Sequence, residues 1–406
     1  MNSKKHDFEP AGLYVHIPFC RTKCRYCGFY SEPIKNHAPR RLISAIITEL
    51  TEKRGQPALS NIEGEPFFKT IYIGGGSPSC LPAKQLFQLI GEITSRCPKP
   101  EEFTIEINPG QVNKDTLNQL HTAGVTRISI GAQSFNSEEL IFLGRKHSVA
   151  DIGRAVRSAK EAGFDNIGLD LIFAIPPSTS LPSTTLETGR AGGSTLKSWK
   201  HSLRSAIDLG VQHISAYALT YEEQTPLQKA VETGEVTPVN EETDRQMYDM
   251  TIDELEKAGF KQYEISNFAK PGFECRHNLN YWANTPYLGI GPAAGSYWQG
   301  KRTLNIADIK KYIEAIEQGK NVTAESETPD NIQVACETAV LNLRRRCGII
   351  LDEFKKQTGF DAAKLFAEPI GKYKKLGLIR TTGKRLYLTR NALPIADSVL
   401  CDFSTT

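Results

Sequence analysis

The sequence lacks any long apolar run, and this absence bears on its location. No segment approaches the roughly 18 consecutive apolar residues that a membrane-spanning helix needs. The first residues, MNSKKHDFEPAG, also lack the apolar centre of a secretory signal peptide. We therefore expect a cytoplasmic protein that contacts membranes at most at their surface.

An excess of charge of either sign is also missing. The chain has 406 residues, and its 49 Lys and Arg residues nearly balance its 46 Asp and Glu residues, so that the formal net charge is +3. This balance does not indicate a nucleic-acid partner. The hydrophobic content of 39% is ordinary for a globular protein. The length suffices for one large domain or two smaller ones.

Cysteine is scarce and irregularly spaced, apart from one cluster. An odd number of nine does not suit a secreted disulfide framework. Most of the scattered cysteines have the character of small buried side chains. The remaining three, Cys20, Cys24 and Cys27, lie in the segment CRTKCRYC with the spacing C-x3-C-x2-C. In a reducing compartment, such a cluster indicates metal binding or redox chemistry.

Short β-rich segments alternate with amphipathic segments up to about residue 220. We predict strands, interpreted as nearly continuous apolar runs, at 11–18, 69–75, 103–108, 126–131, 166–173 and 213–219. We predict helices between them, for example at 40–53, 83–94, 114–124 and 149–163. This order indicates an α/β fold in which a parallel sheet is covered by helices. Six such units would form a partial (β/α)6 barrel, open on one side.

Polar residues follow the predicted strands at their carboxyl ends, where the active site of such a barrel lies. The cysteine cluster follows the first strand, and the glycines at 74–76 follow the second. Glu106 and Asn108 end the third strand, Gln133 follows the fourth and Asp170 lies in the fifth. We expect these side chains to converge on one mouth.

Two regions depart from the strand–helix alternation. Residues 177–198 are rich in Ser, Thr, Pro and Gly, and indicate a long surface loop. Farther on, helical patterns at 306–320 and 330–343 precede a short hairpin predicted around 385–390, an order typical of a winged-helix module. We therefore expect a barrel domain at residues 1–300 and a mostly helical C-terminal domain at residues 301–406.

Three thiolates are one too few for a closed tetrahedral metal site. A structural zinc site needs a fourth Cys or His, and His16 lies inside a predicted strand before the cluster, where it is awkward as a ligand. A zinc-stabilised scaffold without redox activity is one alternative. An iron–sulfur cube held by three thiolates is another, and it leaves one iron open to a small molecule.

The segment CRTKCRYC resembles the signature of the radical S-adenosylmethionine (SAM) superfamily. The resemblance implies a partial barrel, a [4Fe–4S] cluster held by Cys20, Cys24 and Cys27, and SAM on the open iron. YIGGGSPS is similar to the glycine motif of this superfamily. Together, TIEINPG, GAQSF, LGRKH and GLDLIFAIP resemble the branch that contains oxygen-independent coproporphyrinogen III oxidase.

This match also implies which residues would line the SAM site. The carboxylates of Glu106 and Asp170 suit the ribose hydroxyls, and the guanidinium of Arg145 suits the SAM carboxylate. The full set is Tyr14, Tyr26, Gly75, Gly76, Ser77, Glu106, Gln133, Arg145 and Asp170. No catalytic residue is assigned by the match.

A further segment, CRHNLNYW, resembles the H-N-x-x-Y-W mark of the haem chaperone (HemW-type) family, where this mark is linked to haem binding. His277 offers an imidazole to the haem iron, and Tyr281 and Trp282 offer flat faces to the macrocycle. Alternatively, Tyr281 and Trp282 pack the open side of the barrel while hydrogen bonds hold His277 in place. The sequence leaves both interpretations open.

Two departures separate the chain from the oxidase. Phe29 stands where the oxidase carries a further cysteine, and few residues precede the first strand, where the oxidase has an N-terminal extension. The chain also departs from the haem chaperones, because AIPPSTS replaces a GLPGQT-like turn and Gly295 stands where a His is expected.

We therefore expect a radical-SAM-type haem chaperone that delivers haem, as bound cargo, to an acceptor protein. The alternative enzyme would decarboxylate the propionates of coproporphyrinogen by radical chemistry. The sequence identifies neither the haem acceptor nor the electron donor.

Overall fold

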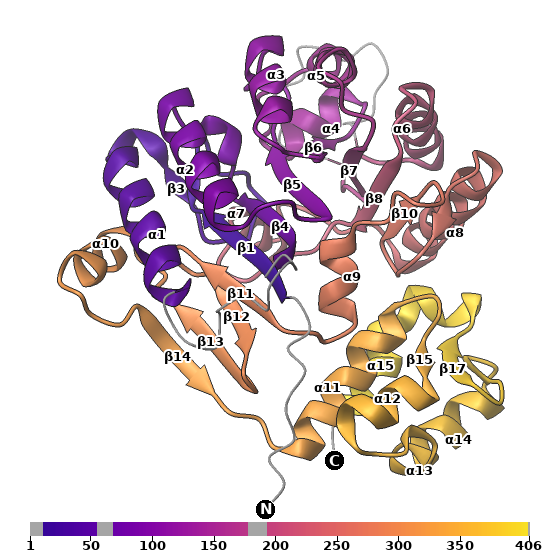
Figure 1. Ribbon diagram of the computed structural model, residues 1–406. Helices are drawn as coiled ribbons and strands as arrows, with labels where there is room; N and C mark the ends of the chain where they lie inside the picture. The colour runs from indigo at the N-terminus through magenta and orange to yellow at the C-terminus, as the bar shows by residue number, and fades with distance from the viewer. Residues whose placement is uncertain (1–10, 55–67, 178–192, 405–406) are drawn as a thin grey trace, which may run out of the picture.

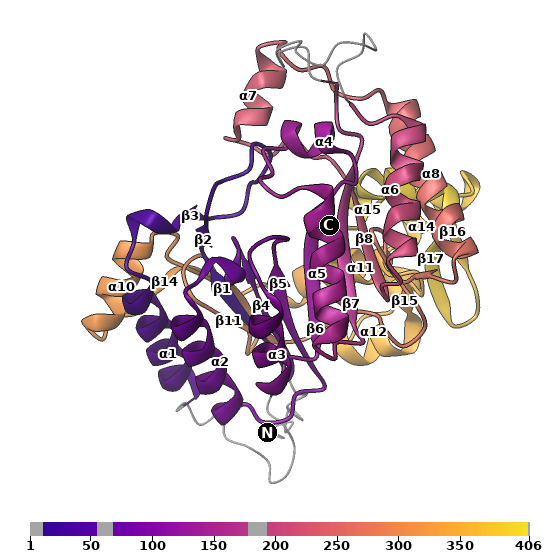
Figure 2. The same ribbon diagram turned by 90° about the horizontal axis from the view of Figure 1, so that it is seen from above.

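The computed structural model describes residues 11–54, 68–177 and 193–404. One large sheet carries helices along its outer side, and a small helical unit follows at the C-terminal end (Figures 1 and 2). Of the surface loop expected at 177–198, residues 178–192 lie outside the described ranges. In the part of the chain that is described, no helix is both long enough and apolar enough to cross a membrane.

The central six strands of the sheet are those expected from the sequence. They lie side by side in chain order, and each neighbouring pair is parallel. They are β1 (Ala11–Ile17), β4 (Phe68–Gly75), β5 (Glu102–Ile107), β6 (Arg127–Gln133), β7 (Ile167–Phe173) and β8 (His213–Ala218). The expected partial barrel of parallel strands is therefore confirmed.

The strands nevertheless differ from the continuous apolar runs that we expected. Apolar residues occupy mainly alternate positions, such as Leu13, Ile71 and Ile105, and pack beneath the helices. Successive strand residues point to opposite faces, so the intervening positions face the interior of the open barrel. These positions are mostly polar or glycine, and include Gly12, Tyr14, His16, Thr70, Tyr72, Gly74, Thr104, Glu106, Arg127, Ser129, Gly131, Gly168, Asp170, His213 and Ser215. The inner face of the sheet is therefore polar.

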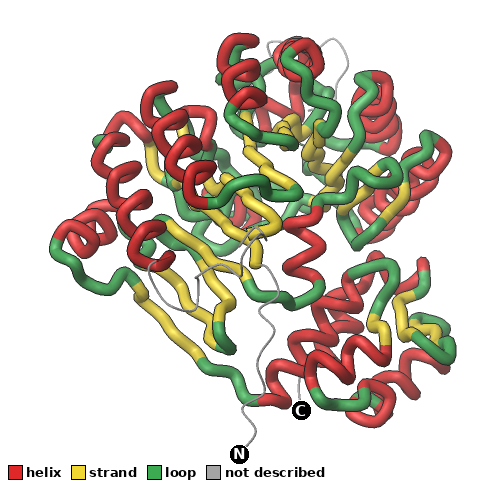
Figure 3. The backbone as a smooth tube through the Cα atoms, viewed as in Figure 1, coloured by secondary structure: helices red, strands yellow, loops and turns green. Residues whose placement is uncertain are grey.

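Helices cover the apolar face of the sheet (Figure 3). In α5 (Val149–Glu161), Ser148 and Asp151 form a capping box that satisfies the first backbone N–H groups. Its buried face consists of Ile152, Ala155, Val156 and Ala159, which have the spacing of one helical stripe. The other helices of this part are α1 (Pro39–Arg54), α2 (Ala83–Arg96), α3 (Lys114–Thr122), α4 (Ser137–Phe142), α6 (Leu196–Asp208), α7 (Pro226–Glu232) and α8 (Glu241–Lys257).

The sheet continues beyond the parallel strands at both edges. β11 (Tyr287–Ile290) pairs in parallel with β1 and is followed by the antiparallel strands β12 (Gly295–Trp298), β13 (Lys301–Asn305) and β14 (Thr323–Glu327). The opposite edge consists of β10 (Asn267–Ala269) and β9 (Lys261–Gln262). A separate short pair joins β2 (Phe19–Cys20) to β3 (Glu32–Pro33). No closed barrel forms within the described ranges, because β14 and β9 end the sheet.

Strand pairing also bears on the expected division at residue 300. β13 and β14 belong to the large sheet although they follow that position. Residues 301–327 are thus joined to the barrel by backbone hydrogen bonds. The two-domain division stays a prediction, and the pairing favours a boundary after β14.

The last part of the chain combines helices with a small antiparallel sheet. β16 (Ile379–Thr381) and β17 (Arg385–Leu388) form the expected hairpin, to which β15 (Ile349–Ile350) adds a third strand. The helices are α11 (Asn331–Arg344), α12 (Leu351–Thr358), α13 (Ala362–Leu365), α14 (Ala367–Lys375) and α15 (Ala396–Ser404). Two further helices, α9 (Arg276–Trp282) and α10 (Ile309–Glu317), precede this part, and short 3-10 turns lie at Ile34–Asn36, Pro78–Cys80 and Arg390–Ile395.

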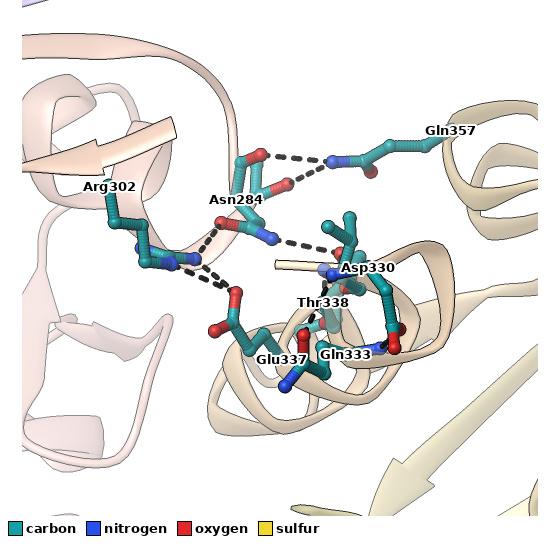
Figure 4. Close-up of polar contacts among 10 residues, drawn as sticks. Asn284, Arg302, Asp330, Gln333, Glu337, Thr338 and Gln357 are labelled. Carbon is teal, nitrogen blue, oxygen red and sulfur yellow. Dashed lines mark hydrogen bonds and ion pairs between the residues drawn. The ribbon is translucent and has the colours of Figure 1, made fainter. Parts of the chain in front are cut away.

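Polar contacts join the C-terminal part to the segment that follows α9 (Figure 4). The Asn284 side-chain amide donates to Thr338 Oγ1 at 2.9 Å. Gln357 Nε2 donates to the Asn284 carbonyl oxygen at 3.1 Å, and Arg302 Nε donates to Glu337 Oε2 at 3.0 Å. α11 and α12 are thereby held against the end of α9 and the start of β13.

A buried carboxylate on α1 fixes the outer strands to the barrel. Glu49 is 2% exposed and accepts hydrogen bonds from Tyr312 at 2.5 Å, from the Gly291 backbone at 2.8 Å and from Asn305 at 2.8 Å. Lys53 supplies the positive charge, with its Nζ 2.8 Å from Glu49 Oε1. Four partners for one buried carboxylate make it a structural centre.

We predict that Glu49→Ala lowers the free energy of unfolding by about 3 kcal/mol or more, because it leaves several buried polar groups without a partner. Urea unfolding followed by circular dichroism measures the change. As a control, Arg41→Ala removes the pair between Arg41 and Glu317, whose side chains are 58% and 49% exposed. This control should cost less than about 1 kcal/mol. An equal loss of unfolding free energy in the two variants would contradict the role of Glu49 as a structural centre.

Candidate functional site

The cysteine loop, residues 20–27, lies at the carboxyl end of the sheet. Cys20, Cys24 and Cys27 are free and half-buried. Burial raises the pKa of Cys20, and the neighbouring Cys27 and Cys24 raise it further. Burial likewise raises the pKa of Cys27, with an added effect of Cys24. The three thiols thus belong to one short loop, and their charges act on one another.

Three thiols in one loop are the donor set of the cube that the resemblance implies. Among the described residues, no three His, Cys, Asp or Glu side chains are arranged to hold one metal ion. A [4Fe–4S] cube takes one thiolate per iron atom, so its cysteines surround a wider space than the ligands of one ion. Gly76 keeps this space open, since a Cβ there would lie 2.9 Å from Cys20 Sγ. The donor set and this open position fit the cube that the resemblance implies.

His16 lies beside the loop, but both of its ring nitrogens are engaged. Nδ1 is 2.8 Å from the Tyr14 hydroxyl, and Nε2 is 3.0 Å from the Tyr30 carbonyl oxygen. Burial lowers the pKa of His16, so the ring is held in its neutral form. In this arrangement His16 does not present a free nitrogen to the cysteine loop.

The glycines after β4 allow close contacts that a side chain would prevent. A Cβ on Gly74 would lie 2.9 Å from the Tyr72 ring and 3.1 Å from the Glu106 carboxyl. Gly75 has a φ of +114°, and a Cβ on it would lie 2.9 Å from the His16 ring. Both positions therefore require glycine, Gly75 by conformation as well as by space.

A cavity of about 540 Å³ opens at the carboxyl ends of the strands, beside the cysteine loop. Its lining includes Cys27 and almost all of the residues expected at the SAM site, namely Tyr26, Gly75, Gly76, Ser77, Glu106, Gln133, Arg145 and Asp170. Tyr14 is the exception, because its hydroxyl is bonded to His16. The cysteine loop and the ends of β4, β5, β6, β7 and β8 thus contribute to one cavity.

Glu106 is held by Tyr72, whose hydroxyl donates to Oε1 at 2.7 Å. Burial raises the pKa of Glu106 to about 7, the Tyr72 hydrogen bond lowers it, and the nearby Asp170 raises it. Burial also raises the pKa of Asp170, which accepts from Ser129 Oγ at 3.2 Å. The cavity therefore holds two carboxylates, one of which titrates near neutral pH.

Arg145 connects the cavity to the cysteine loop. One end of its guanidinium lies 3.6 Å from Cys24 Sγ, and the other donates to the Gly131 carbonyl at 2.8 Å and to Asn108 Oδ1. Gln133 lies nearby with a φ of +66°, after an irregularity in the pairing of β6 with β7. A left-handed conformation is unfavourable for a residue other than glycine, and such strain is concentrated at functional sites.

The segment expected to bind haem lies elsewhere, on α9. His277 is fully buried, with Nδ1 2.8 Å from Thr70 Oγ1 and Nε2 2.9 Å from the Tyr281 hydroxyl. Burial lowers the pKa of His277 to about 3, and Arg127 contributes to the shift. To ligate haem iron, the ring would first have to leave both hydrogen bonds.

Trp282 and Gly295 also lie away from the cavity lining. The Arg344 guanidinium, from α11, stacks 5.0 Å from the centre of the Trp282 ring. Gly295 starts β12 and pairs with Leu304. The role of His277, Tyr281 and Trp282 in haem binding stays a prediction.

Several cavity residues were not foreseen from the sequence. Tyr72, Gly131 and Tyr217 line the cavity although no role was assigned to them from the sequence, whereas Asn108 lines it as expected from its position at the end of the third strand. A usable signal was present, because Tyr72 and Gly131 lie two residues from foreseen positions in or beside the same strand and therefore share their face.

Sequence comparisons relate the chain to known proteins. Residues 14–180 match the sequence model of the Radical SAM superfamily, and residues 330–395 match that of the HemN C-terminal domain. The chain is 34% identical over 397 residues to "Heme chaperone HemW" of Bacillus subtilis, with 96% of this chain and 98% of that protein covered. It is 36% identical over 294 residues to "Heme chaperone HemW" of Escherichia coli, with 70% and 69% covered.

A solved structure shares the fold over almost the whole chain. Coproporphyrinogen III oxidase (HemN) from Escherichia coli, described as a radical SAM enzyme, matches with a TM-score of 0.81 at 20% sequence identity. The match covers 98% of this chain and 91% of that chain. At this identity, the likeness shows the fold alone.

We predict that replacing Cys20, Cys24 or Cys27 by Ala abolishes cluster binding, because two thiolates do not retain a cube that needs three. Iron and sulfide per chain, measured after anaerobic reconstitution, report the loss. Cys80→Ala is the matched control, since Cys80 is also a half-buried free thiol and its Sγ lies 3.5 Å from the carbonyl of Phe19, next to the loop. Zinc in place of iron in the wild-type protein, or iron retained by Cys24→Ala, would contradict the cluster.

We also predict that SAM binds more weakly as the pH falls from 8 to 6. The pKa of Glu106 is about 7, so its carboxylate is protonated below that pH and becomes a poorer acceptor for ribose hydroxyls. The loss should be about tenfold or less. Equilibrium dialysis with labelled SAM measures it, and Glu106→Gln should flatten the profile. An unchanged profile in this variant would assign the titration to another group.

Proposed function

Because the chain belongs to the HemW family of haem chaperones, within the radical SAM superfamily, we propose that it binds haem and transfers it to an acceptor protein. In this proposal it also carries a [4Fe–4S] cluster and SAM. The acceptor and the electron donor are proteins not yet identified, and the cytoplasm is the proposed location. The cluster and SAM, when bound, supply the capacity for one-electron chemistry.

One observation carries the assignment of the cofactors. Cys27 of the cysteine loop lines the same cavity as the carboxylates of Glu106 and Asp170 and the guanidinium of Arg145. In the proposed complex, these carboxylates accept hydrogen bonds from the ribose hydroxyls, and Arg145 binds the SAM carboxylate. Gly75 and Gly76 leave room for the ligand beside the cluster.

The choice of chaperone over enzyme rests on two features. Phe29, at the position of the oxidase's further cysteine, is 70% exposed at the edge of the cavity. An exposed phenyl ring offers no ligand to iron, but it does offer an apolar face to a flat ligand. In addition, the match to the Bacillus subtilis haem chaperone covers nearly the whole of both chains.

A second candidate, coproporphyrinogen oxidation, is kept because the oxidase fold covers 98% of the chain. Anaerobic incubation with SAM, a reductant and coproporphyrinogen III distinguishes the two functions. The chaperone should form no divinyl product. Its appearance at turnover would replace the chaperone assignment with an enzymatic one.

We predict that the purified full-length protein binds haemin stoichiometrically. A haemin titration followed in the Soret region should saturate at one haem per chain, because one chaperone carries one cargo molecule. Apomyoglobin added afterwards tests transfer, since its own Soret spectrum reports haem that has left the chaperone. A linear titration without saturation, as expected for haemin adsorbing to any protein surface, would contradict the proposal.

A further inference from the structure

α9 lies against the starts of β1, β4 and β5, at the opposite end of these strands from the residues that line the cavity. Gly12 and Thr70, near the starts of β1 and β4, contact the His277 ring. A Cβ on Gly12 would lie 3.0 Å from it, and Thr70 Oγ1 is 2.8 Å from Nδ1. Glu102, at the start of β5, accepts from the backbone N–H groups of Arg276 and His277, each at 3.0 Å. Three neighbouring strands thus hold the helix.

The His277 ring contacts a residue that reaches the cavity. It stacks on the Tyr72 ring with 5.2 Å between centroids and an angle of 29° between the planes. The Tyr72 hydroxyl in turn donates to Glu106 Oε1 at 2.7 Å, and both residues line the cavity. On its other side, His277 is held by the Tyr281 hydroxyl, 2.9 Å from Nε2. These contacts connect the H-N-x-x-Y-W segment to the cavity.

The same contacts make His277 a poor ligand for iron in this conformation. A neutral imidazole has one donor and one acceptor nitrogen, and Thr70 and Tyr281 occupy both. The ring has no solvent exposure. Its removal to a haem would leave two hydroxyls and the Tyr72 ring without their partner.

We propose that His277 is a positioning residue for the SAM site and that the H-N-x-x-Y-W segment plugs the polar interior, holding Tyr72 against Glu106. The inference rests on the SAM binding of the proposed function, and it gives the motif a role other than iron ligation. His277 fixes the Tyr72 ring by stacking, and the Tyr72 hydroxyl orients the Glu106 carboxylate toward the ribose. The motif therefore acts on the cavity through one intermediate residue.

The test compares SAM affinity and haem binding in the same anaerobically reconstituted full-length protein. Tyr72→Phe and Tyr281→Phe each remove a single oxygen atom, and His277→Ala removes the ring. We expect the SAM dissociation constant to rise about tenfold in Tyr72→Phe and His277→Ala and less in Tyr281→Phe. The haemin stoichiometry should stay at the wild-type value in all three.

Tyr312→Phe is the matched control. It removes a buried hydroxyl that also donates to a carboxylate, that of Glu49 at 2.5 Å, but Tyr312 does not contact His277, Tyr72 or Glu106. It should lower the melting temperature and leave SAM affinity unchanged. If His277 had a purely structural role, His277→Ala would likewise lower the melting temperature and leave SAM affinity unchanged.

The pH profile gives a second readout. Loss of the Tyr72 hydroxyl removes a hydrogen bond that lowers the pKa of Glu106, so the midpoint of SAM binding should move to higher pH in Tyr72→Phe. Tyr312→Phe should leave the midpoint in place. If His277→Ala does not fold, Tyr72→Phe and Tyr281→Phe test the inference without it.

Three results would overturn the inference. The first is SAM affinity within twofold of wild type in both Phe variants. The second is loss of the Soret band in His277→Ala with SAM affinity unchanged, which would make His277 an iron ligand. The third is a wild-type protein that binds no SAM. Absence of haem binding in the wild-type protein would instead remove only the chaperone function, because SAM affinity is measured independently.

Discussion

The polar inner face of the parallel sheet is the constraint on which the rest of the structure depends. Charged and polar groups inside a protein are costly unless each finds a partner. At the amino ends of the strands, Glu102 and Thr70 find theirs in α9. At the carboxyl ends, Glu106 accepts from Tyr72 and Asp170 from Ser129, and both carboxylates also face the cavity, where a polar ligand can supply further donors. The same strands thus meet a plug at one end and a cavity at the other.

Much of this arrangement could be predicted from the sequence, because it depends on local patterns. Strand–helix alternation indicated the six parallel strands, and the position of Glu106 and Asp170 near strand ends placed them at one mouth. The polarity of the interior was missed, although the strand TIYIGG alternates polar or glycine residues with isoleucine. Reading such strands as continuous apolar runs concealed Tyr72, which lies on the same face as Gly74.

The surroundings of His277 could not be predicted in this way. Thr70, its partner at Nδ1, is 207 residues away in the sequence, and Tyr72 is similarly remote. Such contacts depend on the register of β4 against β1 and on where α9 enters the sheet, which no local pattern specifies. The division near residue 300 illustrates the same limit, since a change in composition does not reveal that β13 pairs with β12.

The position of β1 in the sheet sets the order in which the molecule can be completed. β1 is the first of the described strands along the chain, yet one of its two neighbours, β11, comprises Tyr287–Ile290. At typical rates of translation, roughly tens of seconds pass between the synthesis of β1 and that of β11. The thiols that follow β1 therefore leave the ribosome long before their supporting strand is flanked on both sides. A metal cluster that met the nascent chain before β11 is made would therefore meet a loop without its final support.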